Sequence, residues 1–219
     1  MSAERKWVPA DGLADALRDH TQAWHRRAER SGIIRALLRG QASRQAYALL
    51  LRNLLPAYQQ LEMALDENRE APGLRQIARA EVYRTPAIVA DLNALCGYDW
   101  PQTVPVLTAG RAYAARIDSL AGKEALIGHA YVRYLGDLNG GQIIRRQLVH
   151  SPGLEPEALG FYVFPAIVDV KAFTAEYRAG FDQAGAEIAQ PQAVLAEARL
   201  AFDLNIALSE AVAAASGIR

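Results

Sequence analysis

The sequence has little of several features that would assign a protein to a class at once. Its 219 residues include a single cysteine, Cys96, which excludes a disulfide framework and a cysteine-based zinc site within one chain. Lysine plus arginine number 24, as do aspartate plus glutamate, so the formal net charge is zero. A neutral balance is a poor electrostatic basis for binding nucleic acid, and we expect no such partner.

Long apolar runs are also missing. The opening MSAERKWVPADGL has no apolar signal core, and no window approaches the roughly 20 apolar residues of a membrane span. We therefore expect a cytoplasmic protein with no membrane partner, active as a monomer. Because 51% of the residues are hydrophobic and 22% charged, there is enough apolar material for one domain over residues 1–219, with a flexible N-terminus of about residues 1–10.

The pattern of apolar residues predicts an all-α fold. Such residues recur every three or four positions almost throughout, and no alternating run lies between hairpin turns. Ser43 and Thr85 are predicted N-caps, Gly97 a helix stop, Pro56 a kink, and YDWPQTVP a connecting loop. The predicted helices cover about residues 12–30, a short segment ending at 39, 44–67, 85–97, 104–120, 123–150, 168–184 and 192–215.

The segment YLGDLNGGQIIRRQL reads as helix, yet it contains Gly136, Gly140 and Gly141. Each glycine inside a helix costs about 1 kcal/mol relative to alanine, so the three cost about 3 kcal/mol. Gly136 and Gly140 lie about 40° apart around the helix, which leaves one face as bare backbone between Arg133 and Asp137. Such a face serves either close helix packing or a large flat ligand, and glycines alone leave both uses open.

Asp137 follows Arg133 by four residues, so the two side chains can pair across one helical turn. On an exposed surface such a pair contributes less than about 1 kcal/mol. Beside a glycine gap it would instead be a polar group held in a pocket, where such groups orient water or substrate.

Two stretches resemble the heme oxygenase family. LIGHAYVRYLGDLNGGQ is similar to the family signature, with Asn139 where the common form has serine, and LRDHTQAWHRRAE is similar to its proximal helix. The resemblance implies a single-domain helical fold with heme between a proximal helix and a kinked distal helix. It implies an enzyme that uses dioxygen and external electrons to cleave heme b, both cofactor and substrate, to biliverdin, carbon monoxide and ferrous iron.

A heme iron needs an axial ligand, for which neutral histidine is the common choice in oxygen chemistry. Of the four histidines, His25 alone is favoured, because Glu29 follows it by four residues and can reach the second ring nitrogen. His20 lacks such a carboxylate, His129 is expected to pack away from the iron, and His150 to be solvated. The resemblance also gives His25 as the iron ligand and Glu29 as its partner.

The resemblance implies roles for further residues. Asp137 is the distal acid that orders water, Arg133 and Tyr58 are members of its hydrogen-bond network, and Asn205 is a further contributor. The bare backbone at the three glycines makes room over the heme for an oxygen ligand.

Arg18 lies seven residues, or about two turns, before His25 on nearly the same helix face, so we expect its side chain to reach the heme edge and bind a propionate. The resemblance implies that Arg178 also binds a propionate. Many family members have a lysine where this chain has Thr174, with Lys171 nearby, so the anchoring departs from the common pattern. We nevertheless expect α-meso cleavage. Tyr131 and Phe202 are expected to line the porphyrin.

Other functions remain as alternatives. A heme storage or transport protein would share His25 and the glycine helix but would not need Asp137. A ferritin-like di-iron bundle needs Glu-x-x-His motifs, which the sequence lacks. A helical thiamin hydrolase needs a cysteine nucleophile, for which Cys96 is poorly placed. The expected electron donor is a ferredoxin or a flavoprotein reductase, and arginines at the heme edge suit an acidic partner.

Overall fold

The computed structural model describes residues 12–120, 123–151 and 153–218, and in these residues it contains helices and no strand. The all-α prediction is therefore confirmed. The α-helices are α1 (Leu13–Glu29), α2 (Gly32–Leu38), α3 (Arg44–Glu67), α4 (Thr85–Cys96), α5 (Trp100–Thr103), α6 (Thr108–Asp118), α7 (Leu126–Ala130), α8 (Gly136–Leu148), α9 (Val170–Glu187) and α10 (Pro191–Ala215). Shorter turns are η1 (Ala80–Val82), η2 (Lys123–Ala125), η3 (Tyr131–Leu135), η4 (Pro156–Ala158) and η5 (Gly160–Tyr162).

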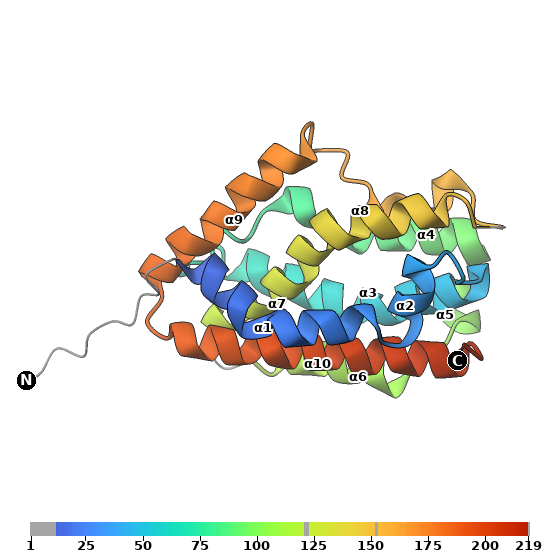
Figure 1. Ribbon diagram of the computed structural model, residues 1–219, viewed down its shortest axis with the longest axis horizontal. Coiled ribbons are helices and arrows are strands. Elements are labelled where there is room, and N and C mark those ends of the chain that lie inside the picture. Colours follow the sequence, from blue (N-terminus) through green and yellow to red (C-terminus); the bar gives the residue numbers. More distant parts are fainter. Residues whose placement is uncertain (1–11, 121–122, 152, 219) are drawn as a thin grey trace, which may run out of the picture.

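Helix α10 is the element against which much of the molecule packs. It contacts α1, α2, α3, α6 and α7, and α1 and α10 run side by side along one edge of Figure 1. The buried residues of α1 include Leu13, Leu17 and Thr21, which recur every four positions and form one stripe. That stripe leaves the remaining faces of α1 free, and one of them borders the site described below.

Gly128 sets the distance between α7 and α10. A Cβ at this position would lie 2.8 Å from the backbone nitrogen of Ala198 and 2.9 Å from the carbonyl oxygen of Val194. No larger residue fits without moving the α10 backbone, so this glycine serves close helix packing.

The helix caps were predicted in part. Ser43 caps α3 as predicted, since its side chain accepts a hydrogen bond from the backbone N–H of Ala46. The prediction that Thr85 caps α4 was wrong, because Thr85 is already the first helical residue. The buried carboxylate of Glu62 on α3 accepts hydrogen bonds from the backbone N–H groups of Arg84 and Thr85 instead. A tertiary contact thus replaces the local cap.

The region between α4 and α6 also differs from its prediction. The expected loop contains the short helix α5, and the helix expected from residue 104 begins at Thr108. Asn53 of α3 explains the late start, because its side chain donates to the carbonyl of Pro105 and accepts from the backbone N–H of Leu107. These bonds hold the intervening residues outside the helix.

The helix predicted over residues 123–150 is divided into η2, α7, η3 and α8, and η3 is a π-helical turn. Figure 1 shows this segment running obliquely from α7 and then changing direction along α8. The distal segment is therefore kinked, as expected, but a π-turn directly before Gly136 was not predicted. Such turns occur often at functional sites.

Within the described ranges, no helix has both the length and the apolar character needed to cross a lipid bilayer. The predicted flexible N-terminus of about residues 1–10 lies outside the described residues.

Candidate functional site

A cavity of about 710 Å³ lies between α1, α9, α10 and the kinked segment formed by η3 and α8. Its volume is within the range of roughly 300–1,000 Å³ that is typical of sites for small organic ligands. All of the predicted site residues line it except Tyr58; those that do are Arg18, His25, Glu29, Tyr131, Arg133, Gly136, Asp137, Gly140, Gly141, Arg178, Phe202 and Asn205. Segments far apart in the sequence therefore meet at one place.

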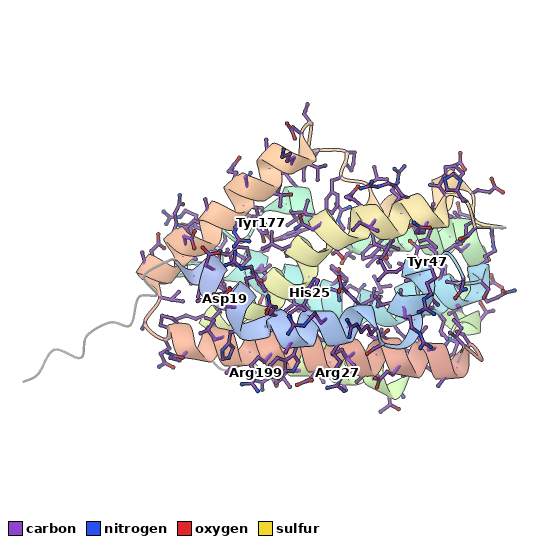
Figure 2. The ribbon with its side chains drawn as sticks, viewed as in Figure 1. Asp19, His25, Arg27, Tyr47, Tyr177 and Arg199 are labelled. Atoms are coloured by element: carbon purple, nitrogen blue, oxygen red, sulfur yellow. The ribbon has the colours of Figure 1, made fainter. Side chains whose placement is uncertain are left out.

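His25 borders this cavity from α1. Its side chain is 59% exposed, and in Figure 2 it lies on the side of α1 that faces α7 and α8. Its ring packs at 73° to the ring of Phe202 in α10, with ring centroids 6.1 Å apart. Glu29 Oε1 lies 3.7 Å from His25 Nδ1, which is beyond hydrogen-bond length. The carboxylate is thus near the predicted nitrogen but does not bind it directly.

The other histidines are elsewhere. His129 is fully buried, and its Nε2 lies 2.8 Å from Glu197 Oε1. Burial lowers the pKa of His129, in opposition to that carboxylate. His20 and His150 are exposed and do not line the cavity. Among the described histidines, only His25 presents its ring to the cavity.

The three glycines of the distal segment have two different surroundings. A Cβ at Gly136 or Gly140 would meet no atom within 4 Å, so the backbone there faces open space. A Cβ at Gly141 would lie 2.7 Å from the ring of Tyr162, so the Tyr162 side chain already fills the space beside this glycine. The expectation of an open face is met by the first two, whereas Gly141 serves close packing because Tyr162 occupies the space beside it.

A polar cluster forms part of the cavity wall. Arg133 Nε donates to the Tyr58 hydroxyl at 3.0 Å, and the same hydroxyl donates to Asp137 Oδ2. Arg133 also donates to the side-chain oxygen of Asn205, and its NH2 lies 3.4 Å from Asp137 Oδ1. Arg133 and Asp137 thus meet across one turn as predicted, and Tyr58 lies behind Asp137 and not on the cavity wall.

Burial controls the electrostatics of this cluster. Asp137 is 4% exposed, and the loss of solvent raises its pKa above the ordinary range, against the opposing pull of Arg133. Burial also raises the pKa of Tyr58, so the phenol stays protonated. Burial alone would lower the pKa of Arg133, but Tyr58 and Asp137 raise it, and the guanidinium stays charged.

Two arginines lie at the open edge of the cavity. Arg18 NH1 is 2.7 Å and Arg178 NH2 is 2.6 Å from the same oxygen, Asp15 Oδ1. Thr174 also lines the cavity, with its hydroxyl hydrogen-bonded within α9, whereas Lys171 does not line it. Asp15 was missed from the sequence, although its position three residues before Arg18 is a usual spacing for an ion pair on a helix.

The sequence also gave no indication of how η5 contributes to the site. Asp91 of α4 accepts hydrogen bonds of 2.8 Å from the backbone N–H groups of both Gly160 and Phe161. These bonds fix η5, which places Tyr162 against Gly141. The available signal was that Asp91 occupies a position within the apolar stripe of α4.

Comparisons with known proteins agree on one family. The family profile described as heme oxygenase matches residues 11–211. The chain is 34% identical to a heme oxygenase from Porphyra purpurea over 201 residues, which cover 90% of this chain and 85% of that protein. A heme oxygenase structure from Leptospira interrogans has a TM-score of 0.86 at 33% identity, covering 91% of this chain and 99% of that one. Heme oxygenase-1 from Synechocystis in complex with heme also has a TM-score of 0.86, at 31% identity, covering 94% and 96%.

Proposed function

This chain belongs to the heme oxygenase family, and we propose that its cavity binds heme between His25 of α1 and the bare backbone at Gly136 and Gly140. The chain is an enzyme that degrades heme. The observation that carries the proposed mechanism is the buried Asp137 carboxyl at the cavity wall, within a network that also holds Arg133 and Tyr58.

The residues present fit a heme group. The cavity wall includes open backbone at Gly136 and Gly140, which accommodates a flat ring system without displacing side chains. His25 presents an exposed imidazole to the same space, and its Nε2 makes no hydrogen bond to any described residue. We therefore propose that the imidazole of His25 would bind the heme iron. Glu29 would hold the imidazole from Nδ1, through a water or after a small rotation.

When bound, heme supplies the iron centre that activates dioxygen with electrons from a donor, and it is also the molecule that is cleaved. The role that we propose for Asp137 is to hold a proton and to order water beside the glycine backbone. Its raised pKa favours proton uptake, and a carboxyl that acts through water delivers protons without contacting the reacting atoms itself.

Tyr58 and Arg133 are positioning residues in this proposal. Tyr58 donates to Asp137 and accepts from Arg133, so the carboxyl can rotate little. Asn205 in turn accepts from Arg133 and fixes the guanidinium from α10. Phe202 of α10 and Tyr131 of η3 would contact the porphyrin from the cavity wall.

We propose that Arg18 and Arg178 bind the two propionates. Both guanidinium groups already lie at the cavity and are held close together by Asp15. After heme binding, the two arginines would bind the propionates as well as the carboxylate of Asp15. With the rim anchored in this way, the expected product is the IXα isomer of biliverdin, which chromatography against the four isomers would test.

An acidic electron donor would suit the surface of α1. Arg26, Arg27 and Arg30 are exposed and border a shallow surface hollow, and Arg26 also lines the cavity. A ferredoxin or a flavoprotein reductase with an acidic docking face is therefore the proposed partner. Electron delivery would then slow as ionic strength rises, because salt screens exposed charges.

We also propose that the chain acts as a single domain and as a monomer. Support comes from the buried apolar side chains, which form one cluster across the described residues. Sedimentation of the heme complex over a range of concentrations tests the oligomeric state.

Turnover of bound hemin tests the proposed function. The wild-type protein and an Asp137→Ala variant would each be titrated with hemin and then given a reductant under air. We expect equal hemin binding, with biliverdin absorption from the wild type only. Asp118→Ala, at an exposed position at the end of α6, is the matched control and should behave as the wild type. Stable bound heme with no biliverdin from the wild type would favour a heme carrier instead.

A further inference from the structure

A row of three tyrosine rings leads from the distal network toward the surface. Tyr58, which donates to Asp137, has its ring centroid 6.2 Å from that of Tyr134. Tyr134 lies in turn 6.2 Å from Tyr83, with the two rings stacked at 30°. Tyr58 and Tyr134 are fully buried, whereas Tyr83 is partly exposed. The row therefore connects the inner end of the cavity wall with solvent.

The hydroxyl groups of these tyrosines differ in whether a hydrogen-bond acceptor lies beside them to take the proton. The Tyr83 hydroxyl donates to Asp66 Oδ1 at 2.9 Å, and Asp66 is exposed and also pairs with Arg69. The Tyr134 hydroxyl is buried and has no hydrogen-bond partner among the described residues. Tyr58 also has a carboxylate beside its hydroxyl, that of Asp137, but Tyr58 is fully buried. Of the three, only Tyr83 combines a carboxylate acceptor with access to water.

Packing alone does not account for the tyrosine at position 134. Burying a hydroxyl without a hydrogen bond costs about 1–3 kcal/mol, and phenylalanine would fill the same space without that cost. The phenol ring of tyrosine is also oxidised more readily than the phenyl ring of phenylalanine. Tyr47 and Tyr113 also have buried hydroxyls without a partner among the described residues, so this feature by itself does not single out Tyr134. What distinguishes Tyr134 is its place between Tyr58 and Tyr83, where its ring can pass electrons between its neighbours.

The charged groups beside the three rings favour Tyr83 as the residue that is left oxidised. The guanidinium carbon of Arg133 lies 5.2 Å from the Tyr58 ring centroid, and a positive charge there makes removal of an electron from Tyr58 less favourable. Tyr134 has no base to take its proton. At Tyr83 the carboxylate of Asp66 can take the proton as the electron leaves, and water can then carry it away.

We propose that Tyr58, Tyr134 and Tyr83 form an electron-transfer path that removes oxidising equivalents from the heme site when bound heme is oxidised without being cleaved. The inference rests on heme binding in the proposed cavity. The oxidant in the test is an organic peracid, which gives one oxygen atom to ferric heme and leaves as the carboxylic acid, so that the heme gains two oxidising equivalents. One electron then passes from Tyr83 through Tyr134 and Tyr58 to the heme. The O–H bond of Tyr83 breaks, its proton goes to Asp66, and a neutral tyrosyl radical remains.

The test uses the ferric heme complex, one equivalent of peracid, a nitroso spin trap and peptide mapping by mass spectrometry. Wild-type protein should carry the trap on Tyr83. In Tyr134→Phe the target residue is still present but the path is interrupted, so the adduct on Tyr83 should fall to background. That substitution removes no hydrogen bond to a described residue. Tyr98→Phe, at a side chain that is 87% exposed and outside the row, is the matched control and should leave the adduct unchanged.

Two results would overturn the path: an undiminished adduct on Tyr83 in Tyr134→Phe, or no adduct on Tyr83 in wild-type protein whose heme has been oxidised. Hemin titration of each variant before the peracid is added keeps this test separate from the proposed function. Absent hemin binding would refute the heme site itself, whereas normal binding with the wrong labelling refutes only the path.

Discussion

Adding one methyl group at adjacent glycines of α8 should change stability in opposite directions. In Gly140→Ala the new Cβ meets nothing within 4 Å, so the heme-free protein gains about 1 kcal/mol of helix propensity. In Gly141→Ala the Cβ would lie 2.7 Å from the buried ring of Tyr162. Overpacking of that kind costs about 1–3 kcal/mol, which exceeds the gain in propensity. The free energy of unfolding of this second variant should therefore fall, by about 1 kcal/mol.

Urea unfolding of the heme-free proteins, followed by circular dichroism, measures both changes. In a chain of this length 1 kcal/mol corresponds to about 2–4 °C in the unfolding temperature. Hemin titration gives the second half of the prediction: Gly140→Ala should bind hemin about tenfold more weakly, or about 1.4 kcal/mol, because its methyl group occupies heme space. A Gly140→Ala protein that is destabilised without heme, or that binds hemin as tightly as the wild type, would refute the open-backbone reasoning.

Three further changes test other parts of the site. In His25→Ala, hemin should lose its axial imidazole, seen as a changed Soret band that added imidazole restores; a wild-type spectrum would contradict His25 as ligand. Burial raises the pKa of Asp91 to about 6 from an unfolded value of about 4, so the folded protein binds this proton more tightly than the unfolded chain does. The resulting stabilisation is present below about pH 4 and is lost as the pH rises through about 6, and urea unfolding should show this loss relative to Asp91→Asn; parallel pH profiles would refute it. Asp15→Asn should tighten hemin binding by up to about 1 kcal/mol, because Arg18 and Arg178 no longer share a carboxylate; weaker binding would show that Asp15 is needed to hold the arginines in place.

The sequence indicated the helical fold and much of the site because both depend on local spacing. Apolar residues three and four apart predicted the helices, and the four-residue spacing from Gly136 to Gly140 placed both on one open face. The spacing from Arg133 to Asp137 likewise predicted a contact that the structure contains. The choice of His25 among the histidines followed from its own helix, and His25 does line the cavity.

The features that could not be predicted depend on contacts between segments far apart in the chain. Glu62 replaces Thr85 as the cap of α4 from another helix. Gly141 resembles its neighbours in sequence, but Tyr162 of η5 decides its role. The π-turn η3 could not be predicted, because a single wide turn spans too few residues to show as a change in the apolar period.

A crystal structure of the protein with bound hemin tests the central claim most directly. The account predicts His25 Nε2 coordinated to the iron on one side of the macrocycle, and the backbone of Gly136 and Gly140 covering the other side. Iron coordinated by a different side chain, or a macrocycle lying away from these two glycines, would contradict it.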